Sequence, residues 1–159
     1  CVLSNVPDAR GLETARARGL TALCVPSKGT ERSEYDRRLV ETLRPHHPDL
    51  ICLAGFMRIL SPEFLRAYGG RVLNIHPALL PSFPGLHAQR QALTHGVKIS
   101  GCTVHFVDQG VDTGPIILQR AVPVLEGDSE ETLSARILEQ EHDLYWRAIA
   151  EVLHQLYPR

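Results

Sequence analysis

The sequence predicts an α/β fold in which a mostly parallel sheet is flanked by helices. Short apolar runs rich in β-branched residues alternate with longer amphipathic segments, a pattern typical of strands joined by crossover helices. The length of 159 residues corresponds to one domain, and no internal repeat or linker-like change in composition divides the chain. We therefore expect residues 1–159 to form a single domain.

The expected strands are the apolar runs at residues 2–4, 21–25, 50–54, 72–76, 102–107 and 116–122. Between the second and third runs, residues 33–43 place apolar side chains on one helical stripe. Ser33 is the expected N-cap, with Asp36 at the capping-box position. Pro45 ends this helix because proline cannot continue it.

The last segment, residues 128–156, has the clearest helical pattern. Leu133, Ile137 and Leu144 recur at helical spacing, which predicts an apolar stripe packed on the sheet. Asp128 and Glu131 are expected to form a capping box at its start.

Composition excludes several classes of partner. Seventeen Lys and Arg against 18 Asp and Glu give a net charge of −1, so no overall field attracts nucleic acid or anionic lipid. No apolar run reaches the ~18 residues of a membrane span, and no export signal opens the chain. We expect a cytoplasmic protein that binds small molecules.

The sequence gives no sign of a metal site. Eight histidines are present, but none has the spacing of a zinc motif. Cys1, Cys24, Cys52 and Cys102 form no CxxC pair, and we expect them to be buried, reduced thiols.

Two polar side chains mark a candidate site at the end of a strand. Asn74 and His76 alternate with apolar residues and so point to one face, and Pro77 helps to end the strand there. The carboxyl ends of parallel strands are where open α/β sheets bind ligands. The alternative is that both side chains only satisfy loop backbone.

Two carboxylates are further candidates. Asp112 lies in a glycine-bounded loop after a strand and can approach His76, although an ordinary turn uses the same residue types. Glu141 falls on the apolar stripe of the last helix, where a carboxylate is expected only if it is paired or reaches a ligand. The alternative there is that the side chain reaches past the apolar stripe to solvent or forms a local salt bridge.

Three segments carry a resemblance to a known family: Ala-Gly-Phe-Met-Arg-Ile-Leu-Ser-Pro at 54–62, Asn-Ile-His-Pro-Ala-Leu-Leu-Pro at 74–81 and Gly-Cys-Thr-Val-His-Phe-Val at 101–107. They stand in the family's order, together with residues 111–114 and 127–129. On these motifs the chain resembles the folate-dependent phosphoribosylglycinamide formyltransferases of purine synthesis.

The resemblance implies a Rossmann-like formyltransferase fold and transfer of a formyl group from 10-formyltetrahydrofolate to the amine of glycinamide ribonucleotide. The family's catalytic Asn, His and Asp fall on Asn74, His76 and Asp112. Their chemistry suits the reaction, because an amide and a protonated imidazole can stabilise the oxygen that becomes negative. Asp112 would favour the imidazolium form of His76 and pass protons through water.

The same resemblance implies the binding residues. The folate would contact Arg32, Phe56, Met57, Arg58, Ile59, Leu60, Val107, Asp108 and Val111. The ribonucleotide would contact Pro77, Gly85, His87 and Glu141. No metal is implied.

Family members begin with a strand, a phosphate-binding loop and a helix, and the resemblance implies that this first βα unit is missing from the sequence. Three alternatives remain open. Formyltetrahydrofolate deformylase shares the trio but gives the formyl group to water, methionyl-tRNA formyltransferase shares the folate half, and an inactive fragment would bind folate without turnover. We expect a monomer or a homodimer.

Overall fold

The computed structural model describes residues 1–158, and its contacts divide the chain into two compact units. The first unit comprises Cys1–Asp49 and Leu60–Ala67, and the second comprises Leu50–Ile59 and the chain from Tyr68 onward. Helices and strands alternate along the chain, so the predicted α/β class is confirmed. That residues 1–159 form a single domain stays a prediction.

The first unit combines a pair of strands with helices. Its elements are β1 (Val2–Ser4), α1 (Arg10–Ala17), β2 (Ala22–Cys24), α2 (Arg32–Leu43), a short 3-10 helix (Arg44–His46) and most of α3 (Pro62–Tyr68). Strands β1 and β2 pair in parallel, with Val2 opposite Ala22. Leu12, Tyr35 and Phe64 are fully buried and form the centre of its core.

Helix α2 begins earlier than predicted. Glu31, and not Ser33, is the N-cap, because its carboxylate accepts the backbone N–H groups of Ser33 at 2.8 Å and Glu34 at 3.2 Å. The Ser33 hydroxyl donates to the same carboxylate. Asp36 is not in a capping box either, since it is fully buried and accepts the backbone N–H of Ser61.

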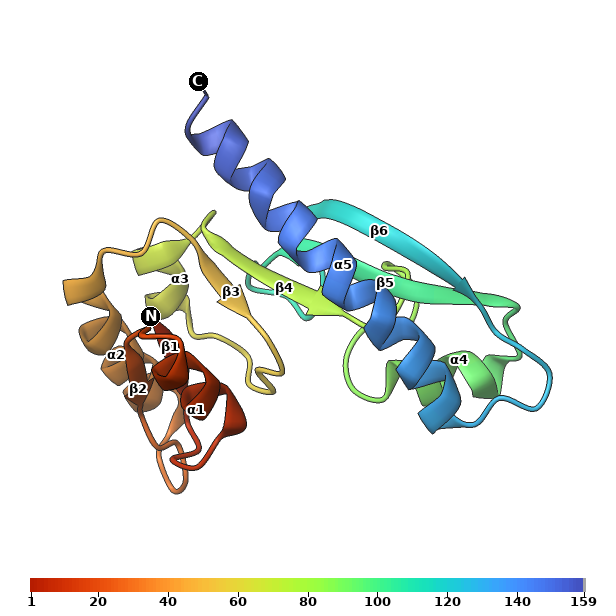
Figure 1. Ribbon diagram of the computed structural model, residues 1–159, viewed down its shortest axis with the longest axis horizontal. Coiled ribbons are helices and arrows are strands. Elements are labelled where there is room, and N and C mark those ends of the chain that lie inside the picture. The colour runs from red at the N-terminus through yellow and green to blue at the C-terminus, as the bar shows by residue number, and fades with distance from the viewer. Residues whose placement is uncertain (159) are drawn as a thin grey trace. The chain divides into compact units, whose positions relative to one another are not determined.

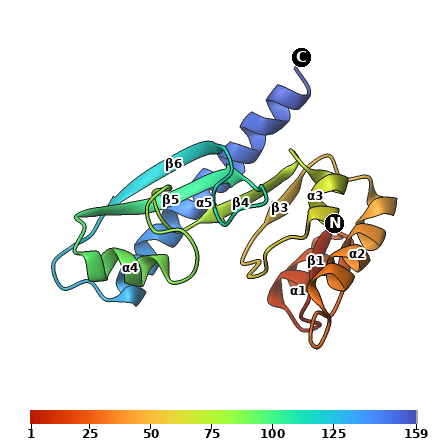
Figure 2. The same ribbon diagram turned by 180° about the vertical axis from the view of Figure 1, so that it is seen from behind.

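The second unit carries the larger sheet. Its elements are β3 (Ile51–Leu53), β4 (Val72–His76), α4 (Ala88–His95), β5 (Ile99–Phe106), β6 (Ile116–Pro123) and α5 (Glu130–Leu156). Figures 1 and 2 show this sheet from opposite sides, with α5 lying along one face.

The sheet of the second unit is mixed and has the order β3-β4-β5-β6. Strands β3 and β4 are parallel as predicted, whereas β4–β5 and β5–β6 are antiparallel. The loop at residues 107–115 explains part of this difference, because it is shorter than a parallel crossover requires. Of the four described strand pairs, two are therefore parallel and two antiparallel.

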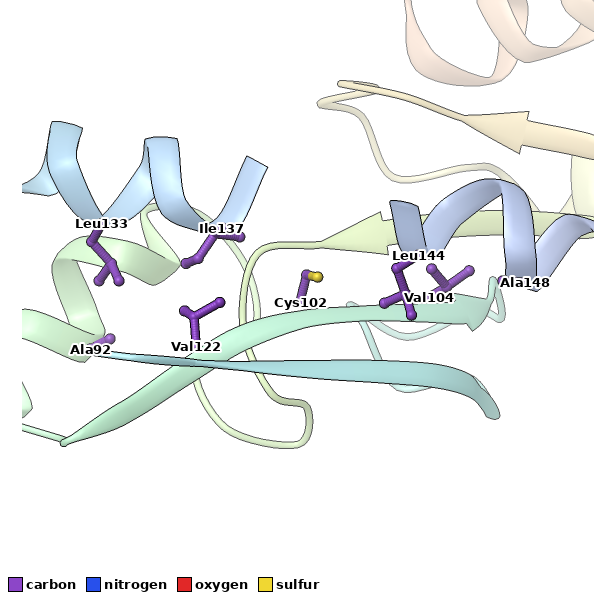
Figure 3. Packing of buried hydrophobic residues seen from close by; sticks show 8 residues of the cluster. All are labelled: Ala92, Cys102, Val104, Val122, Leu133, Ile137, Leu144 and Ala148. Carbon is purple, nitrogen blue, oxygen red and sulfur yellow. The ribbon is translucent and has the colours of Figure 1, made fainter. Parts of the chain in front are cut away.

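The core of the second unit lies between the sheet and α5. Figure 3 shows the side chains of this cluster meeting between the helices and the strands. The cluster consists of Ala92, Cys102, Val104, Val122, Leu133, Ile137, Leu144 and Ala148. The predicted apolar stripe of the last helix is thus confirmed.

The cap of α5 is Ser129 and not Asp128. The Ser129 hydroxyl accepts the Thr132 N–H at 3.2 Å, and the Thr132 hydroxyl accepts the Ser129 N–H at 2.9 Å, so Glu131 is not the capping-box partner. Asp128 instead pairs with Arg136 at 2.7 Å, which ties the start of the helix to its second turn.

The structure also bears on the expectations for the cysteines and for membrane-spanning helices. All four cysteines are free thiols, but Cys1, Cys24 and Cys52 are exposed, so the prediction of burial holds only for Cys102. Cys24 lies on β2 and Cys52 on β3, and neither strand contains a fully buried residue. Within residues 1–158, no helix is both long enough and apolar enough to span a membrane.

Candidate active site

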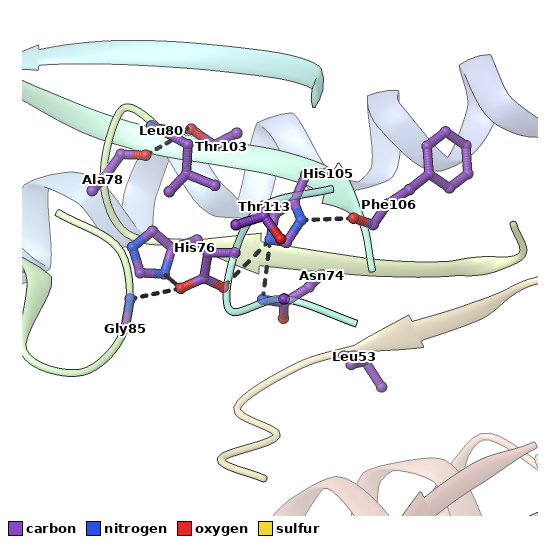
Figure 4. A network of polar contacts seen from close by, with 12 residues as sticks. Leu53, Asn74, His76, Ala78, Leu80, Gly85, Thr103, His105, Phe106 and Thr113 are labelled. Atoms are coloured by element: carbon purple, nitrogen blue, oxygen red, sulfur yellow. Dashed lines mark hydrogen bonds and ion pairs between the residues drawn. The ribbon is translucent and has the colours of Figure 1, made fainter. Parts of the chain in front are cut away.

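Strands β4 and β5 bring four polar side chains to one face of the sheet. The antiparallel register pairs Asn74 with His105 and His76 with Thr103. Alternate residues of a strand share a face, so all four side chains project from the same side. Figure 4 shows these four side chains gathered on that side. The predicted common face of Asn74 and His76 is therefore confirmed.

The Asp112 carboxylate lies between two imidazoles. One oxygen, Oδ2, is 3.3 Å from Nδ1 of His76, and the other, Oδ1, is 3.6 Å from Nε2 of His105. The backbone N–H of Gly85 donates to Oδ2 at 2.8 Å. The side chains of His76, His105 and Asp112 are only 6%, 3% and 13% exposed, so their electrostatic interactions are screened less than they would be in water.

The hydrogen bonds indicate which ring nitrogens carry protons. Nε2 of His76 lies 2.8 Å from the Phe83 carbonyl oxygen, and Nδ1 of His105 lies 2.8 Å from the Phe106 carbonyl oxygen. A carbonyl only accepts, so each of these nitrogens donates. The second nitrogen of each ring then faces Asp112, and Nε2 of His105 also lies 3.4 Å from Nδ2 of Asn74. The cluster thus links Asn74, the two imidazoles and the Asp112 carboxylate.

A tight loop after β5 presents the Asp112 carboxylate. Asp112 has a φ of 55°, in the left-handed region that few residues other than glycine adopt. Asp108 braces the loop, because its Oδ1 accepts the Gly110 N–H at 2.9 Å and the Thr113 hydroxyl at 2.7 Å. At Gly114, an added Cβ would lie 1.8 Å from the Phe106 carbonyl oxygen, so only glycine fits.

Thr103 anchors the chain that follows His76. Its hydroxyl donates to the Ala78 carbonyl at 2.7 Å and accepts the Leu80 N–H at 3.0 Å. Gln119 on β6 donates to the same hydroxyl at 3.0 Å and to the Leu80 carbonyl at 2.9 Å. The loop after β4 is therefore fixed to β5 and β6 by buried polar contacts.

His105 and Thr103 were missed as site residues by sequence reasoning. A signal for them was present, because Thr103 and His105 alternate with Cys102 and Val104 just as Asn74 and His76 alternate with apolar residues. The same alternation, read on the neighbouring strand, would have placed both on the polar face.

Glu141 lies in a pocket that is separate from this cluster. The pocket has a volume of about 460 Å³ and is lined by Gly55, Ile75, Glu141 and Trp146, among others. Ile75 belongs to the face of β4 opposite His76, so the pocket opens on the α5 side of the strand. Burial raises the pKa of the Glu141 carboxyl above its usual range. Glu141 is thus a half-buried carboxylate, as its place on the apolar stripe predicted.

Tyr145 closes one wall of this pocket. Its hydroxyl donates to the Leu53 carbonyl at 2.7 Å and lies 3.2 Å from the Leu73 carbonyl oxygen, so it bridges β3 and β4. Burial raises the pKa of this phenol, which remains a donor. On the same side of the sheet, burial and the nearby Glu141 raise the pKa of Cys102 to about 12.

The remaining substrate-binding candidates lie on the loop between β4 and α4. Pro77 follows His76 directly and is half-buried. Gly85 contacts Asp112 through its backbone, whereas His87 is exposed and is the N-cap of α4, with a φ of 58°. The loop therefore brings Gly85, but not the His87 side chain, into the described cluster.

The folate-binding candidates are mostly exposed. Met57, Ile59 and Val111 are 77%, 49% and 46% exposed, so they present apolar surface that a ligand can cover. One carboxylate oxygen of Asp108 accepts hydrogen bonds from Gly110 and Thr113 in its own loop. The Val107 N–H donates to the Val72 carbonyl at 2.9 Å. In the second unit, Phe56 and Arg58 are half-buried.

The last two folate-binding candidates belong to the first unit. Leu60 is 5% exposed there, and Arg32 is the exposed first residue of α2. Among residues 1–158, no group of three or more His, Cys, Asp or Glu side chains is arranged to hold a metal ion.

Comparison with known proteins identifies the family of this chain. The family model described as "Formyl transferase" matches residues 1–149. The chain belongs to the formyl transferase family. Among the relatives of this formyl transferase chain, the phosphoribosylglycinamide formyltransferase of Escherichia coli (strain K12) is 52% identical over 145 residues, which are 91% of this chain and 68% of that protein.

Longer proteins also contain the matching segment. The trifunctional purine biosynthetic protein adenosine-3 of Drosophila melanogaster is 51% identical over 154 residues, 96% of this chain, but the chain spans only 11% of that protein. Among solved structures, glycinamide ribonucleotide transformylase 1 from Symbiobacterium toebii has a TM-score of 0.89 and 56% identity, and the match covers 93% of this chain and 70% of that one.

Proposed function

We propose that this protein transfers a formyl group from 10-formyltetrahydrofolate to the amine of glycinamide ribonucleotide, a step of purine biosynthesis. The names of the relatives support the reaction. The observation that carries the proposal is the buried cluster of Asn74, His76 and Asp112 at the carboxyl end of β4.

The proposed chemistry needs donors where negative charge develops. When the amine attacks the formyl carbon, the formyl oxygen becomes negative, and N–H groups of Asn74 and His76 stabilise it. Removing one such donor commonly lowers the rate by about 10²–10³. In the resting geometry Nε2 of His76 is bonded to the Phe83 carbonyl at 2.8 Å, so donation to substrate replaces that bond.

Asp112 balances the protons of the reaction. The attacking amine must lose one proton and the folate nitrogen must gain one when the formyl group leaves it, so no net proton is consumed. The Asp112 carboxylate lies 3.3 Å from His76 and can pass a proton through water. His76 is then the acid of the site and Asp112 its partner.

The binding regions suit the two substrates. The exposed side chains of Met57, Ile59 and Val111 offer apolar surface that the flat pterin ring of the folate can cover. Arg32 carries a charge that complements the acidic tail of the folate. The pocket of Glu141 begins at Gly55, where the chain leaves the carboxyl end of β3, and its carboxylate can accept hydroxyl or amine groups of the ribonucleotide.

We propose small molecules as the partners, and neither nucleic acid nor membrane, on the basis of the net charge of −1. The protein is expected in the cytoplasm as a monomer or a homodimer. Sedimentation of the purified protein across a range of concentrations distinguishes the two states.

Absorbance of the folate product tests the function. The protein is mixed with 10-formyltetrahydrofolate, with glycinamide ribonucleotide present and then omitted. Formation of product only with the ribonucleotide supports the transferase. Formation without it supports a deformylase, and folate binding with no product in either mixture supports a binding protein; both outcomes contradict the proposal.

A further inference from the structure

The loop between β4 and α4 supplies two backbone groups to the catalytic pair. The Phe83 carbonyl accepts from Nε2 of His76 at 2.8 Å, and the Gly85 N–H donates to Asp112 Oδ2 at 2.8 Å. Phe83 thus contacts His76, and Gly85 contacts Asp112. Any movement of the loop changes the hydrogen bonds of His76 and Asp112 together.

This loop has an unfavourable backbone conformation. Phe83 and His87 have φ angles of 54° and 58°, in the left-handed region, and Gly85 has a φ of 78°. A side chain other than glycine at positive φ persists only where surrounding contacts hold it. Contacts from outside the loop are therefore needed to keep this conformation.

Gln91 on α4 provides such contacts. Its Nε2 donates to the Leu86 carbonyl at 2.9 Å and to the Pro84 carbonyl at 3.3 Å, so its amide group grips the chain on both sides of Gly85. Helix α4 is itself fixed to the core, because Ala88 and Ala92 are 1% and 0% exposed. Gln91 therefore connects a rigid helix to the strained loop.

We infer that Gln91 is a positioning residue for the catalytic pair. It acts through the loop, by holding Gly85 against Asp112 and the Phe83 carbonyl against His76. The inference rests on the proposed function, since it assigns Gln91 to the reaction proposed for His76 and Asp112. Gln91 touches neither side chain of the pair and so is not itself a catalytic residue.

Substitution of Gln91 tests the inference. Gln91→Met keeps the length of the side chain but removes both N–H donors, and Gln91→Glu turns a carboxylate toward the two carbonyls. We expect kcat to fall by about ten- to a hundredfold in Gln91→Met, and further in Gln91→Glu, because small misplacements of catalytic groups are costly. The KM for 10-formyltetrahydrofolate should stay within about twofold, because none of the folate-binding candidates lies on this loop.

The matched control is Gln89→Met on the same helix. Gln89 makes no side-chain hydrogen bond within residues 1–158, so this variant should keep the wild-type kcat. The second readout is hydrogen exchange of the Gly85 amide, which the bond to Asp112 protects. We expect this exchange to accelerate in Gln91→Met and not in Gln89→Met, while amides of β5 keep their protection.

Three outcomes would overturn the inference. Gln91→Met with the kcat and Gly85 exchange of Gln89→Met would show that the loop does not depend on Gln91. Faster exchange throughout β5, or loss of folding, would assign Gln91 to general stability. If the wild-type protein transfers no formyl group, the proposed function fails, and unchanged Gly85 exchange in Gln91→Met would then overturn the positioning role separately.

Discussion

The two faces of β4 and β5 are built from alternate residues of the same two strands and differ completely in chemistry. On the α5 side, Ile75, Cys102 and Val104 pack into the apolar core. On the other side, Asn74, His76, Thr103 and His105 form a buried polar network with Asp112. His76, Thr103 and His105 on one face and Cys102 and Val104 on the other are buried, so the two faces differ in how each is stabilised.

The apolar face needs only close packing, whereas the polar face needs a partner for each donor and acceptor. Burying an apolar side chain contributes about 1.5–3 kcal/mol, and this gain follows the area removed from water and needs no specific partner atom. A buried polar group costs about 1–3 kcal/mol if its partner is lost. Thr103 shows how the network meets this demand, since its hydroxyl donates once and accepts twice. Mutations on the apolar face should therefore change mainly the free energy of unfolding, and mutations on the polar face mainly the catalytic rate.

The largest expected effect is on the polar face. His76→Ala should lower kcat by about 10³-fold or more, because it removes the proton donor of the site. The apolar core is untouched, so the free energy of unfolding should change by less than it does in a core variant. Steady-state formyl transfer and urea denaturation measure the two quantities. Near-wild-type turnover would contradict the mechanism.

The reciprocal change is on the apolar face. Leu144 is 2% exposed in the cluster beneath α5, and Leu144→Ala should lower the free energy of unfolding by about 2–5 kcal/mol. At temperatures where the variant stays folded, its kcat should remain near that of the wild type. A large loss of kcat in the folded variant would mean that the two faces are coupled through the strands.

Asp112→Asn is a smaller and sharper test of the polar face. Asparagine tolerates the φ of 55° at this position, so the loop is preserved while the negative charge between the two imidazoles is removed. We expect kcat to fall by about 10²-fold. Asp108→Asn in the same loop is the control, because an amide oxygen can still accept from Gly110 and Thr113, and since Asp108 is itself a folate-binding candidate, kcat is compared at saturating folate. Equal losses in the two variants would indicate loop damage and not loss of charge.

The sequence predicted those features of the two faces that depend on local periodicity. Alternation placed Asn74 and His76 on one face, and helical spacing placed Leu133 and Ile137 in the core. The position of Glu141 on an apolar stripe predicted its partial burial. These features are set by the period of each element and need no tertiary information.

The features that the sequence did not predict depend on contacts between distant segments. The direction of β5 and β6 is decided by how the chain turns, and apolar runs look alike in either direction. The N-cap of α2 is Glu31 and not Ser33, because the longer Glu31 side chain reaches the amides of Ser33 and Glu34. Alternation along residues 102–106 indicated a polar face for His105, but its place beside Asn74 follows from the pairing of β5 with β4, which the sequence pattern does not give.

Glu141 differs from its neighbours on the apolar side of β4, because it is a carboxylate. Burial raises its pKa, so the folded state favours the neutral form. Any stability from this shift is fully present below the unfolded pKa of about 4.3 and is lost as pH rises through the folded pKa. At pH 7 the charged Glu141 therefore costs free energy that a neutral side chain would not.

Glu141→Gln should accordingly stabilise the protein at pH 7, by less than about 1 kcal/mol, and leave its stability below pH 4 unchanged. The control is Glu139→Gln on the exposed side of α5, which removes the same charge without the burial. Urea denaturation at the two pH values measures the difference. If Glu141→Gln also raises the KM for the ribonucleotide, the carboxylate is retained for substrate binding at a cost in stability. Greater stability with an unchanged KM would remove Glu141 from the proposed site.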